Sequence, residues 1–558
     1  LVEWMIGLSL LVLGTPVAAQ TDLLGGDDLA ESDPSAAAIE PIRIELESFG
    51  VGGVVRPGTW AAIRLALTEQ TNERREVIVR LGLRDADGDL TEFRTVVSTN
   101  PSIRPPVAVY ARIPFGFTGD PAPMIGIYEA LEGGTGTGAL GYRAGDLVTQ
   151  TRLPQSAVTN AVLLGGQGAM AVVGNNVMGL DAYSLGVDAG STIVPFGHEQ
   201  SKLARGITPS DLPDRWYGLA AFAELIWTEG SPVSMSIEQA RALREWVQRG
   251  GHLVIVLPVV GNDWLALENQ ELASLLPRVS IERRESQPIS AYVPMLAITP
   301  DVVLQRPITV HALEPLAESE PREAITILAG PDGRGVVSRR LVQTGAVTLI
   351  GLDLAAVREG RGGAEAGVNF RPGNSVSPGL PEADVFWHRV LGRRGALMSR
   401  AGVDAYNSQP NTPQIGSRMG SWVDSDLGDE INLTGRAATG VLLGIGVFAC
   451  YWLIAGPGGF LALKSRNFTR HAWVAFLAAG AVFTGLAWGG AWFIKPKSLT
   501  FDHLTFLDHV YGERLQRSRT IASLMVPAYG SATIEVGTED ELAVGGRARF
   551  THLASPWE

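Results

Sequence analysis

Two uncharged runs of sequence decide how this chain is organised. They are Ala437–Leu463, AATGVLLGIGVFACYWLIAGPGGFLAL, and Ala472–Ile494, AWVAFLAAGAVFTGLAWGGAWFI. Because a helix of about 20 apolar residues crosses the hydrocarbon core of a bilayer, each run is long enough to be a transmembrane helix. The short segment Lys464–His471 separates them, so the sequence predicts a two-helix membrane hairpin. The alternative is a buried helix pair of a soluble domain, but buried helices seldom stay uncharged for so long.

The residues around these runs indicate where the membrane surface lies. Gly456–Gly459 contains a proline, which predicts a helix break at the surface and leaves a first span of Ala438–Ala455. The second run ends in aromatic and cationic residues that favour the headgroup layer: Trp488, Trp492, Lys495 and Lys497.

The N-terminus has the pattern of an export signal. Met5–Leu13 is a short apolar core, and the small residues Val17–Ala19 precede Gln20, where signal peptidase is expected to cleave. We therefore expect a signal peptide over residues 1–19 and a disordered leader over 20–38. The large domains then lie on the extracytoplasmic (periplasmic) side of a bacterial inner membrane. The cations between the runs lie inside, as the positive-inside rule prefers: Lys464, Arg466 and Arg470.

Composition argues against several classes of function. The net charge of −13 disfavours nucleic acid as a partner, because a phosphate backbone is held by clustered cations. The single cysteine, Cys450, lies in the first run, so no aqueous cysteine can act as a nucleophile or zinc ligand. The chain begins at Leu1 rather than at a methionine and ends at Glu558 in what reads as the middle of a domain, from which we expect either a fragment or an alternative start.

Apolar and polar residues alternate over residues 39–150, which predicts a β-sandwich domain. The alternating positions are Ile42, Ile44 and Leu46; Ile63, Leu65 and Leu67; and Val77, Val79, Leu81 and Leu83. Asp87-Gly88 predicts the turn of a hairpin before Phe93–Val97. Four carboxylates near this turn are oxygen ligands of the type that calcium prefers: Asp85, Asp87, Asp89 and Glu92. They lack the length and spacing of an EF-hand loop, so a solvated turn is favoured.

Residues 155–395 read as an α/β domain with a parallel sheet covered on both sides. Ser236 and Gln239 predict a capping box, and the helix that follows ends at a glycine pair before the apolar strand His252–Leu257. The predicted buried face of that helix is Ile237, Ala240, Leu243 and Val247. Other predicted elements are strands at Ala161–Leu164 and Phe222–Trp227, a hairpin over Gly335–Leu352 closing the sheet edge, and a last helix over Pro381–Gly392.

The remaining sequence predicts a polar, glycine-rich tether over 396–436 and a partial β-domain over 498–558. In the latter, strand-like runs fall at 500–510, 519–526 and 532–536. The expected fold is multidomain: a β-sandwich, an α/β domain, two transmembrane helices over 437–463 and 472–494, and a C-terminal β segment.

Three segments carry a resemblance to a known family. Ser236–Ile255, SIEQARALREWVQRGGHLVI, resembles the helix-Gly-Gly-strand signature of bacterial proteins with a class I glutamine amidotransferase-like fold. Gly456–Leu463, GPGGFLAL, and Asp502–His509, DHLTFLDH, are similar to large membrane-anchored exported proteins that carry such a domain. The resemblance covers roughly residues 155–536 and implies an amidotransferase-like or flavodoxin-like parallel sheet.

The same resemblance implies that the enzymatic site has been lost. The family's enzymes use a cysteine on a strand-to-helix turn, whereas Cys450 lies in a predicted membrane span. No G-x-S-x-G motif supplies another nucleophile. We therefore expect a non-catalytic binding or scaffolding role, with the lipid bilayer and envelope or membrane proteins as partners and with no cofactor.

The strongest candidate site is the segment Asp211–Tyr217, which combines charge with two aromatic side chains just before the central helix. Loops at the strand ends of an α/β sheet are where ligands bind by default. The residues predicted to bind a ligand are Asp211, Asp214, Arg215, Trp216 and Tyr217. The alternative is a packed connection in which Trp216 and Tyr217 simply cover the sheet.

Three weaker patterns have simpler explanations. Gly165–Gly168 could present amides to an anion, but a plain turn is favoured. His198-Glu199 lacks the second histidine of a zinc motif, because Lys202 stands there, so we expect a surface loop. A metal site is weakly suggested, and not predicted, at Asp502, His503, Asp508 and His509.

The runner-up function is an envelope hydrolase that acts on polymers or peptides. Asp211, Asp214 or Glu224 would then act as acid and base. A transporter is disfavoured, because two spans without an intramembrane charge offer no ion path. An enzyme should show carboxylates that converge in a deep pocket, whereas a scaffold should show a broad flat surface.

Overall fold

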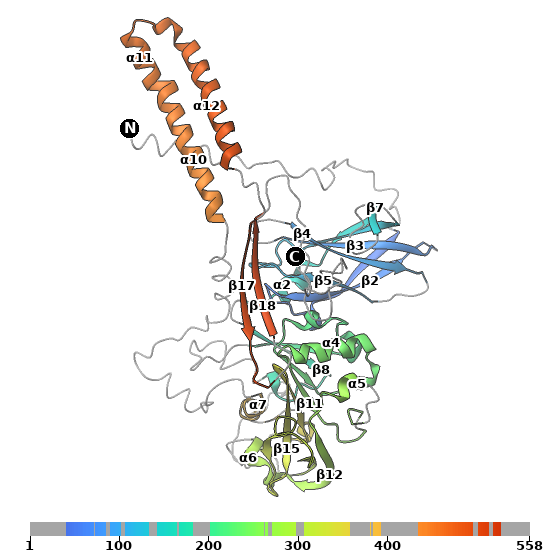
Figure 1. Cartoon of the computed structure of the whole chain (residues 1–558). Helices are drawn as coiled ribbons and strands as arrows, with labels where there is room; N and C mark the ends of the chain where they lie inside the picture. The colour runs from blue at the N-terminus through green and yellow to red at the C-terminus, as the bar shows by residue number, and fades with distance from the viewer. Residues whose placement is uncertain are drawn as a thin grey trace, which may run out of the picture. The chain divides into compact units, whose positions relative to one another are not determined.

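The computed structural model describes residues 41–71, 73–84, 90–101, 106–132, 142–164, 167–181, 201–261, 263–265, 270–296, 306–357, 380, 383–391, 434–494, 500–512 and 517–525. The chain is multidomain and rich in β-sheet, as the sequence predicts (Figure 1). The predicted signal peptide, the leader and the tether up to residue 433 lie outside the described residues.

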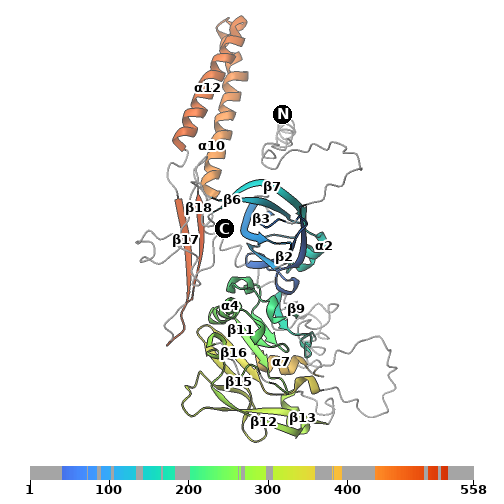
Figure 2. The same cartoon turned by 90° about the vertical axis from the view of Figure 1, so that its right-hand side faces the viewer.

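The first domain is a β-sandwich, in which two antiparallel sheets share one core within the described ranges (Figure 2). One sheet has the order β1 (Ile42–Phe49), β2 (Trp60–Glu69), β5 (Pro106–Arg112). The other has the order β4 (Leu90–Thr99), β3 (Arg75–Arg84), β6 (Met124–Glu132), β7 (Tyr142–Arg152). One face of β3 meets the opposite sheet, so its alternating apolar residues are all buried: Val77, Val79, Leu81 and Leu83.

The β3–β4 hairpin confirms the prediction made from Asp87-Gly88. Leu81 lies opposite Phe93 in the antiparallel register. The turn itself, with the carboxylates that suggested calcium at residues 85, 87 and 89, lies outside the described residues.

The second domain is built on a mixed sheet with the order β12-β13-β15-β16-β11-β10-β8-β9, and β14 pairs with β15. The strands are β8 (Gly168–Val173), β9 (Ser201–Ile207), β10 (Glu224–Trp227), β11 (His252–Val256), β12 (Val279–Pro288), β13 (Pro307–Pro315), β14 (Ile325–Ala329), β15 (Gly335–Val342) and β16 (Gly345–Ile350). Among the described residues, its helices are α4 (Ile237–Gln248), α5 (Gln270–Ala273), α6 (Val293–Leu296) and α7 (Ala383–Leu391), whereas α2 (Gln155–Ala161) packs into the core of the sandwich. β9, β8, β10, β11 and β16 run parallel, which confirms the predicted parallel sheet.

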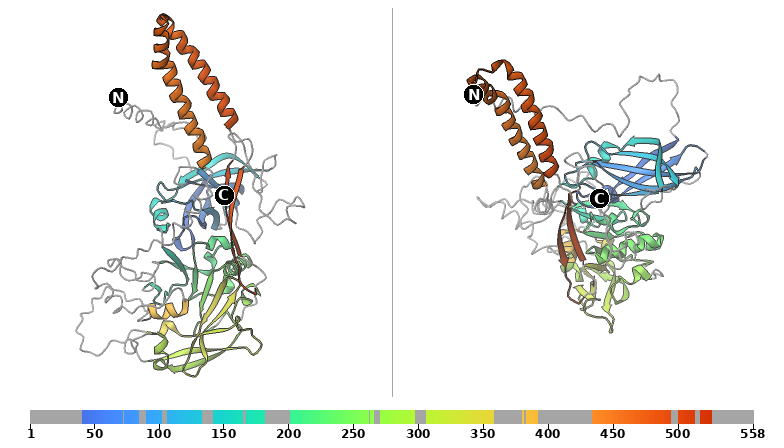
Figure 3. Two further views of the ribbon diagram at one scale, coloured as in Figure 1. Left: turned by 60° about the vertical axis from the view of Figure 1, so that its left-hand side comes forward. Right: turned by 45° about the horizontal axis from the view of Figure 1, so that its top comes forward.

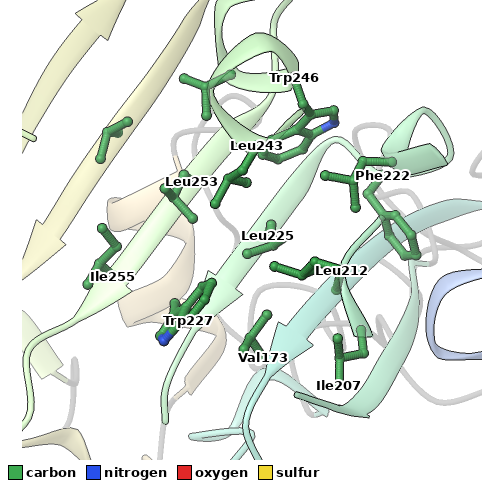
Figure 4. Close-up of a cluster of buried hydrophobic side chains, with 14 of the residues drawn as sticks. Val173, Ile207, Leu212, Phe222, Leu225, Trp227, Leu243, Trp246, Leu253 and Ile255 are labelled. Atoms are coloured by element: carbon green, nitrogen blue, oxygen red, sulfur yellow. The ribbon is translucent and has the colours of Figure 1, made fainter. Parts of the chain in front are cut away.

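The inner parallel strands β8, β10, β11 and β16 are mainly apolar because both faces of the sheet are covered there, whereas β9, at the end of the sheet, is partly polar and exposed. Leu225 of β10 belongs to the same buried cluster as Leu243 and Trp246 of α4, which lie over one face (Figure 4). The next residue, Ile226, joins the core on the other face together with Trp387 of α7.

α4 shows why the sequence begins and ends a helix where it does. The Gln239 amide donates to Ser236 Oγ at 3.2 Å, and the Ser236 amide donates to Gln239 Oε1 at 2.9 Å, which completes the predicted capping box. After the helix, Gly251 is required because a Cβ there would lie 2.3 Å from the Trp246 ring. Ile237 is 63% exposed and does not belong to the buried face, contrary to the prediction, because the first turn of α4 lies outside the core.

Two predictions for the α/β domain are wrong. The β15–β16 hairpin does not close the sheet, because β16 pairs with β11, and β13 and β12 continue the sheet beyond β15. Ala161–Leu164 is not a strand, since α2 ends at Ala161 and Val162 forms an isolated bridge to Val55 of the sandwich. The strand in this region is β8, which begins at the end of the glycine run.

Two apolar helical segments form a hairpin (Figure 3). The first path consists of α10 (Thr434–Leu453), a π-type turn (Ile454–Gly458) and α11 (Gly459–Ser465), and the second is α12 (Ala472–Ile494). Among the described residues, two helical segments are long and apolar enough to cross a membrane, Gly444–Ser465 and Thr469–Gly490. After α12, β17 (Thr500–Asp508) and β18 (Arg517–Met525) pair as an antiparallel ribbon, and the strand predicted at 532–536 lies outside the described residues.

The predicted helix break at Gly456–Gly459 is instead a local distortion. Gly456 leaves the helical backbone region, with φ −91° and ψ −110°, but helix resumes at Gly459. Before the distortion, the Tyr451 ring contacts Phe476 and Phe483 of α12, with ring centroids 6.2 and 5.6 Å apart. The hairpin is therefore held together by aromatic packing.

Candidate functional site

The predicted ligand segment begins directly after the carboxyl end of β9. Two short 3-10 turns shape it, Pro209–Asp211 and Trp216–Leu219. Asp211 Oδ2 accepts hydrogen bonds from the Thr208 amide at 2.8 Å and the Thr208 hydroxyl at 2.6 Å. The Gln239 side-chain amide of α4 donates to the carbonyl of Leu212 at 2.6 Å, so the segment is fixed to the start of α4.

Asp211 forms an ion pair with Arg64 of β2 in the sandwich. Arg64 also lies 3.3 Å from a carboxylate oxygen of Glu47. Partial burial opposes ionisation of Asp211, but the hydrogen bonds from Thr208 and the charge of Arg64 outweigh it, and the pKa of Asp211 is lowered. Asp211 is therefore a stable anion whose partner comes from the other domain.

Asp214 is engaged by the sandwich in the same way. The Tyr110 hydroxyl of β5 donates to the Asp214 carboxylate, and the Asp214 amide donates to the same hydroxyl at 3.1 Å. Burial, with the nearby charge of Asp214, raises the pKa of Tyr110. Gly218 is needed for this approach, because a Cβ there would lie 2.9 Å from the Tyr110 ring.

The aromatic residues of the segment pack rather than line an open pocket. The Tyr217 ring lies edge-on to Trp60 at 5.5 Å and to Tyr110 at 5.1 Å between centroids. Trp216 contacts Tyr217 at 5.8 Å and carries the Arg249 guanidinium 4.4 Å above its ring. Burial raises the pKa of Tyr217.

The structure thus brings the five predicted residues together, but most of their functional groups already have partners in the chain. Asp211, Asp214 and Tyr217 contact the sandwich, Trp216 lies against Arg249, and Arg215 is exposed. These contacts are those of a packed connection between the sandwich and the α/β domain.

Glu224, the third carboxylate of the hydrolase alternative, does not join Asp211 and Asp214. It is the first residue of β10, is 5% exposed, and lies opposite His252 of β11. Because β9 and β10 both run parallel to β8, Asp211 follows the carboxyl end of the sheet and Glu224 stands at its amino end.

A row of polar residues crosses the sheet near Glu224, and sequence reasoning missed it. His252 Nε2 lies 2.8 Å from the Thr348 hydroxyl of β16, which also accepts from Arg339 Nε of β15 at 3.0 Å. Arg339 donates in turn to the Val390 carbonyl of α7. An acidic residue, a histidine and a hydroxyl are the side-chain types of a nucleophile triad, but Thr348 is fully buried, so no substrate reaches its oxygen.

A second feature missed from sequence is the topological switch point between β8 and β10. The connections that follow β8 and β10 lie on opposite faces of the sheet. The one after β8 packs into the core that contains Met178, and the one after β10 leads to α4 on the other face. The Asn175 amide donates to a Glu229 carboxylate oxygen at 3.0 Å across this point, and both residues are exposed. Gly174 has φ +118° and leaves no room for a Cβ beside Thr228. Such points bind ligands in open α/β sheets, and the sequence signal is a glycine directly after an apolar strand.

The weaker sequence candidates gain no support. Gly168 begins a strand and not a helix, so its run has no helix N-terminus to offer an anion. His198-Glu199 lies outside the described residues. Asp502 and His503 are neighbours on β17 and project to opposite faces, and no group of three or more potential metal ligands occurs in the described part of the chain.

Comparisons with known proteins give this chain no family. No protein-family model matches it, and no curated protein matches it. Among solved structures, it is similar to a beta-glucuronidase from glycoside hydrolase family 2, with 10% identity over 40% of this chain and a TM-score of 0.13. A candidate beta-galactosidase from Bacteroides fragilis matches with 10% identity, 40% coverage and a TM-score of 0.13. The chain spans 21% and 39% of those two chains, and a likeness at this TM-score carries no argument.

Proposed function

We propose that this chain is an anchored protein of the bacterial envelope that binds or assembles other envelope or membrane proteins without catalysing a reaction. In this proposal, the α10–α11 path and α12 cross the inner membrane, and the sandwich and the α/β domain lie on its outer side. The length and apolar character of the two helical segments support the anchoring.

The observation that carries a non-catalytic role is the placement of the candidate carboxylates. Asp211 and Asp214 are engaged by Arg64 and Tyr110, and Glu224 lies at the opposite end of the sheet. General acid–base catalysis needs both groups within reach of the same reacting atoms. The carboxylates of the hydrolase alternative do not meet that requirement, which favours a binding or scaffolding role.

We further propose that the α/β domain is an amidotransferase-like domain without its cysteine nucleophile. The parallel strands and the unit of α4, two glycines and β11 support this relationship. Cys450 lies on the apolar helix α10, and in the proposed membrane-inserted arrangement no aqueous substrate meets its thiol.

Protease protection tests the topology. A tag at residue 30 is placed in right-side-out vesicles that are then treated with protease. We expect the tag to be digested, because export puts the leader and both large domains outside. A protected tag would move these domains to the cytoplasm and overturn the envelope role. Alkaline carbonate extraction of the same vesicles tests the anchor, since an inserted protein stays in the membrane pellet.

A further inference from the structure

The connection between the two apolar helical segments is a concentrated cationic surface. Lys464 lies in the last turn of α11, Arg466 caps it, and Arg470 lies in the 3-10 turn before α12. All three side chains are exposed. The sequence contains no aspartate or glutamate between Glu430 and Asp502, so neither helix supplies a counter-charge to these cations.

The backbone keeps these cations together at one end of the hairpin. The Phe468 amide donates to the Leu463 carbonyl at 3.0 Å, and the Asn467 amide donates to the Lys464 carbonyl at 3.2 Å. Asn467 adopts φ +58°, which makes the reversal tight. The His471 amide donates to the Phe468 carbonyl at 3.0 Å, which leads directly into α12.

The start of α12 adds positive potential to the same surface. α12 spans 23 residues and has no acidic residue in its first turn, so no side chain offsets the positive end of its dipole. Exposed aromatic residues flank the cations, as is typical of the headgroup layer of a membrane: Phe460, Phe468 and Trp473.

We propose that this cationic tip, defined by Lys464, Arg466 and Arg470, binds the phosphate headgroups of anionic phospholipids in the leaflet where the hairpin turns. The inference rests on the proposed membrane insertion and adds a lipid class to it. Charge complementarity selects the ligand, because an anionic headgroup supplies the net negative charge that the helices lack, whereas the phosphate of a zwitterionic headgroup is already balanced by its own ammonium group.

The test measures lipid preference around the full-length protein in bilayers of phosphatidylcholine. Spin-labelled phosphatidylglycerol and spin-labelled phosphatidylcholine are compared by electron spin resonance, which gives their relative association constant. We expect a preference for phosphatidylglycerol that falls in the variant Lys464→Gln, Arg466→Gln, Arg470→Gln, because each of these cations contributes up to about fivefold. Lys495→Gln with Lys497→Gln is the control for the two lysines that follow α12, and it should keep more of the preference than the triple variant.

Equal preference in the wild-type protein and the triple variant would overturn the inference, as would an equal loss in the control. Raising NaCl to about 0.5 M should also abolish the preference in the wild-type protein, because screening acts without any substitution that could disturb insertion. Carbonate extraction separates the two proposals. Release of the wild-type protein by carbonate refutes the anchor itself, whereas retention without lipid preference refutes the lipid site.

Discussion

Replacing Tyr217 with alanine should loosen the connection between the sandwich and the α/β domain. The ring makes edge-on contacts with Trp60 and Tyr110, each contributing about 1 kcal/mol beyond simple burial. Because the ring is only partly buried, its lost apolar contact adds about 1 kcal/mol more. We therefore expect Tyr217→Ala to lower the free energy of opening this connection by about 3 kcal/mol, or about 100-fold in the opening equilibrium.

Hydrogen–deuterium exchange of the full-length protein measures that opening directly. The Gly218 amide is bonded to Arg215 and the Ala220 amide to Tyr217, so both report on the segment. Their exchange should accelerate by about two orders of magnitude in Tyr217→Ala, since exchange follows the opening equilibrium. Arg215→Ala, a change at the neighbouring exposed residue, is the control. If both variants exchange within about threefold of the wild-type protein, the ring contacts do not hold the connection and the reasoning is wrong.

Three further outcomes follow from the same structure. Asp211→Asn should lower the unfolding temperature at pH 7, because a carboxyl with a lowered pKa stabilises the fold while it is ionised. The difference in unfolding temperature from the wild-type protein should shrink as the pH falls below about 4, where this carboxyl becomes protonated. Tyr110→Phe should cost about 2 kcal/mol in the exchange assay by removing the hydroxyl that bonds Asp214. In a spectrophotometric titration it should remove a tyrosine that ionises above the ordinary range, because burial and the charge of Asp214 raise the pKa of Tyr110. Gly251→Ala should destabilise the α/β domain by about 2 kcal/mol or more in thermal unfolding, because its Cβ would meet the Trp246 ring.

Sequence patterns predict a strand or helix correctly where the interactions that form it join residues close together in the sequence. The alternation of Val77, Val79 and Leu81 marks β3 because one face of that strand is buried. The Ser236 capping box marks α4 because its two hydrogen bonds join residues three apart. In the same way, the charged and aromatic residues of Asp211–Tyr217 mark one short stretch of sequence, and the structure brings these residues together.

The sequence shows less where distant residues decide the structure. Arg64 and Tyr110 lie more than a hundred residues before the segment that they engage, so no local pattern shows that Asp211 and Asp214 have partners. β12 is rich in charge because it forms the exposed edge of the sheet, and that composition hid it as a strand. Pro457 suggested a helix end, but a π-type turn absorbs its missing amide and lets the helical path continue.

The location of Cys450 on α10 has a consequence for the covalent chemistry of the whole chain. No other thiol exists in this sequence, so the sandwich and the α/β domain hold no group that can form a disulfide or a mixed disulfide with glutathione. Whichever compartment surrounds them, thiol–disulfide exchange does not alter their packing. A cysteine introduced anywhere in those domains would therefore be the only thiol of the chain outside α10, and its maleimide labelling could be compared directly with that of Cys450.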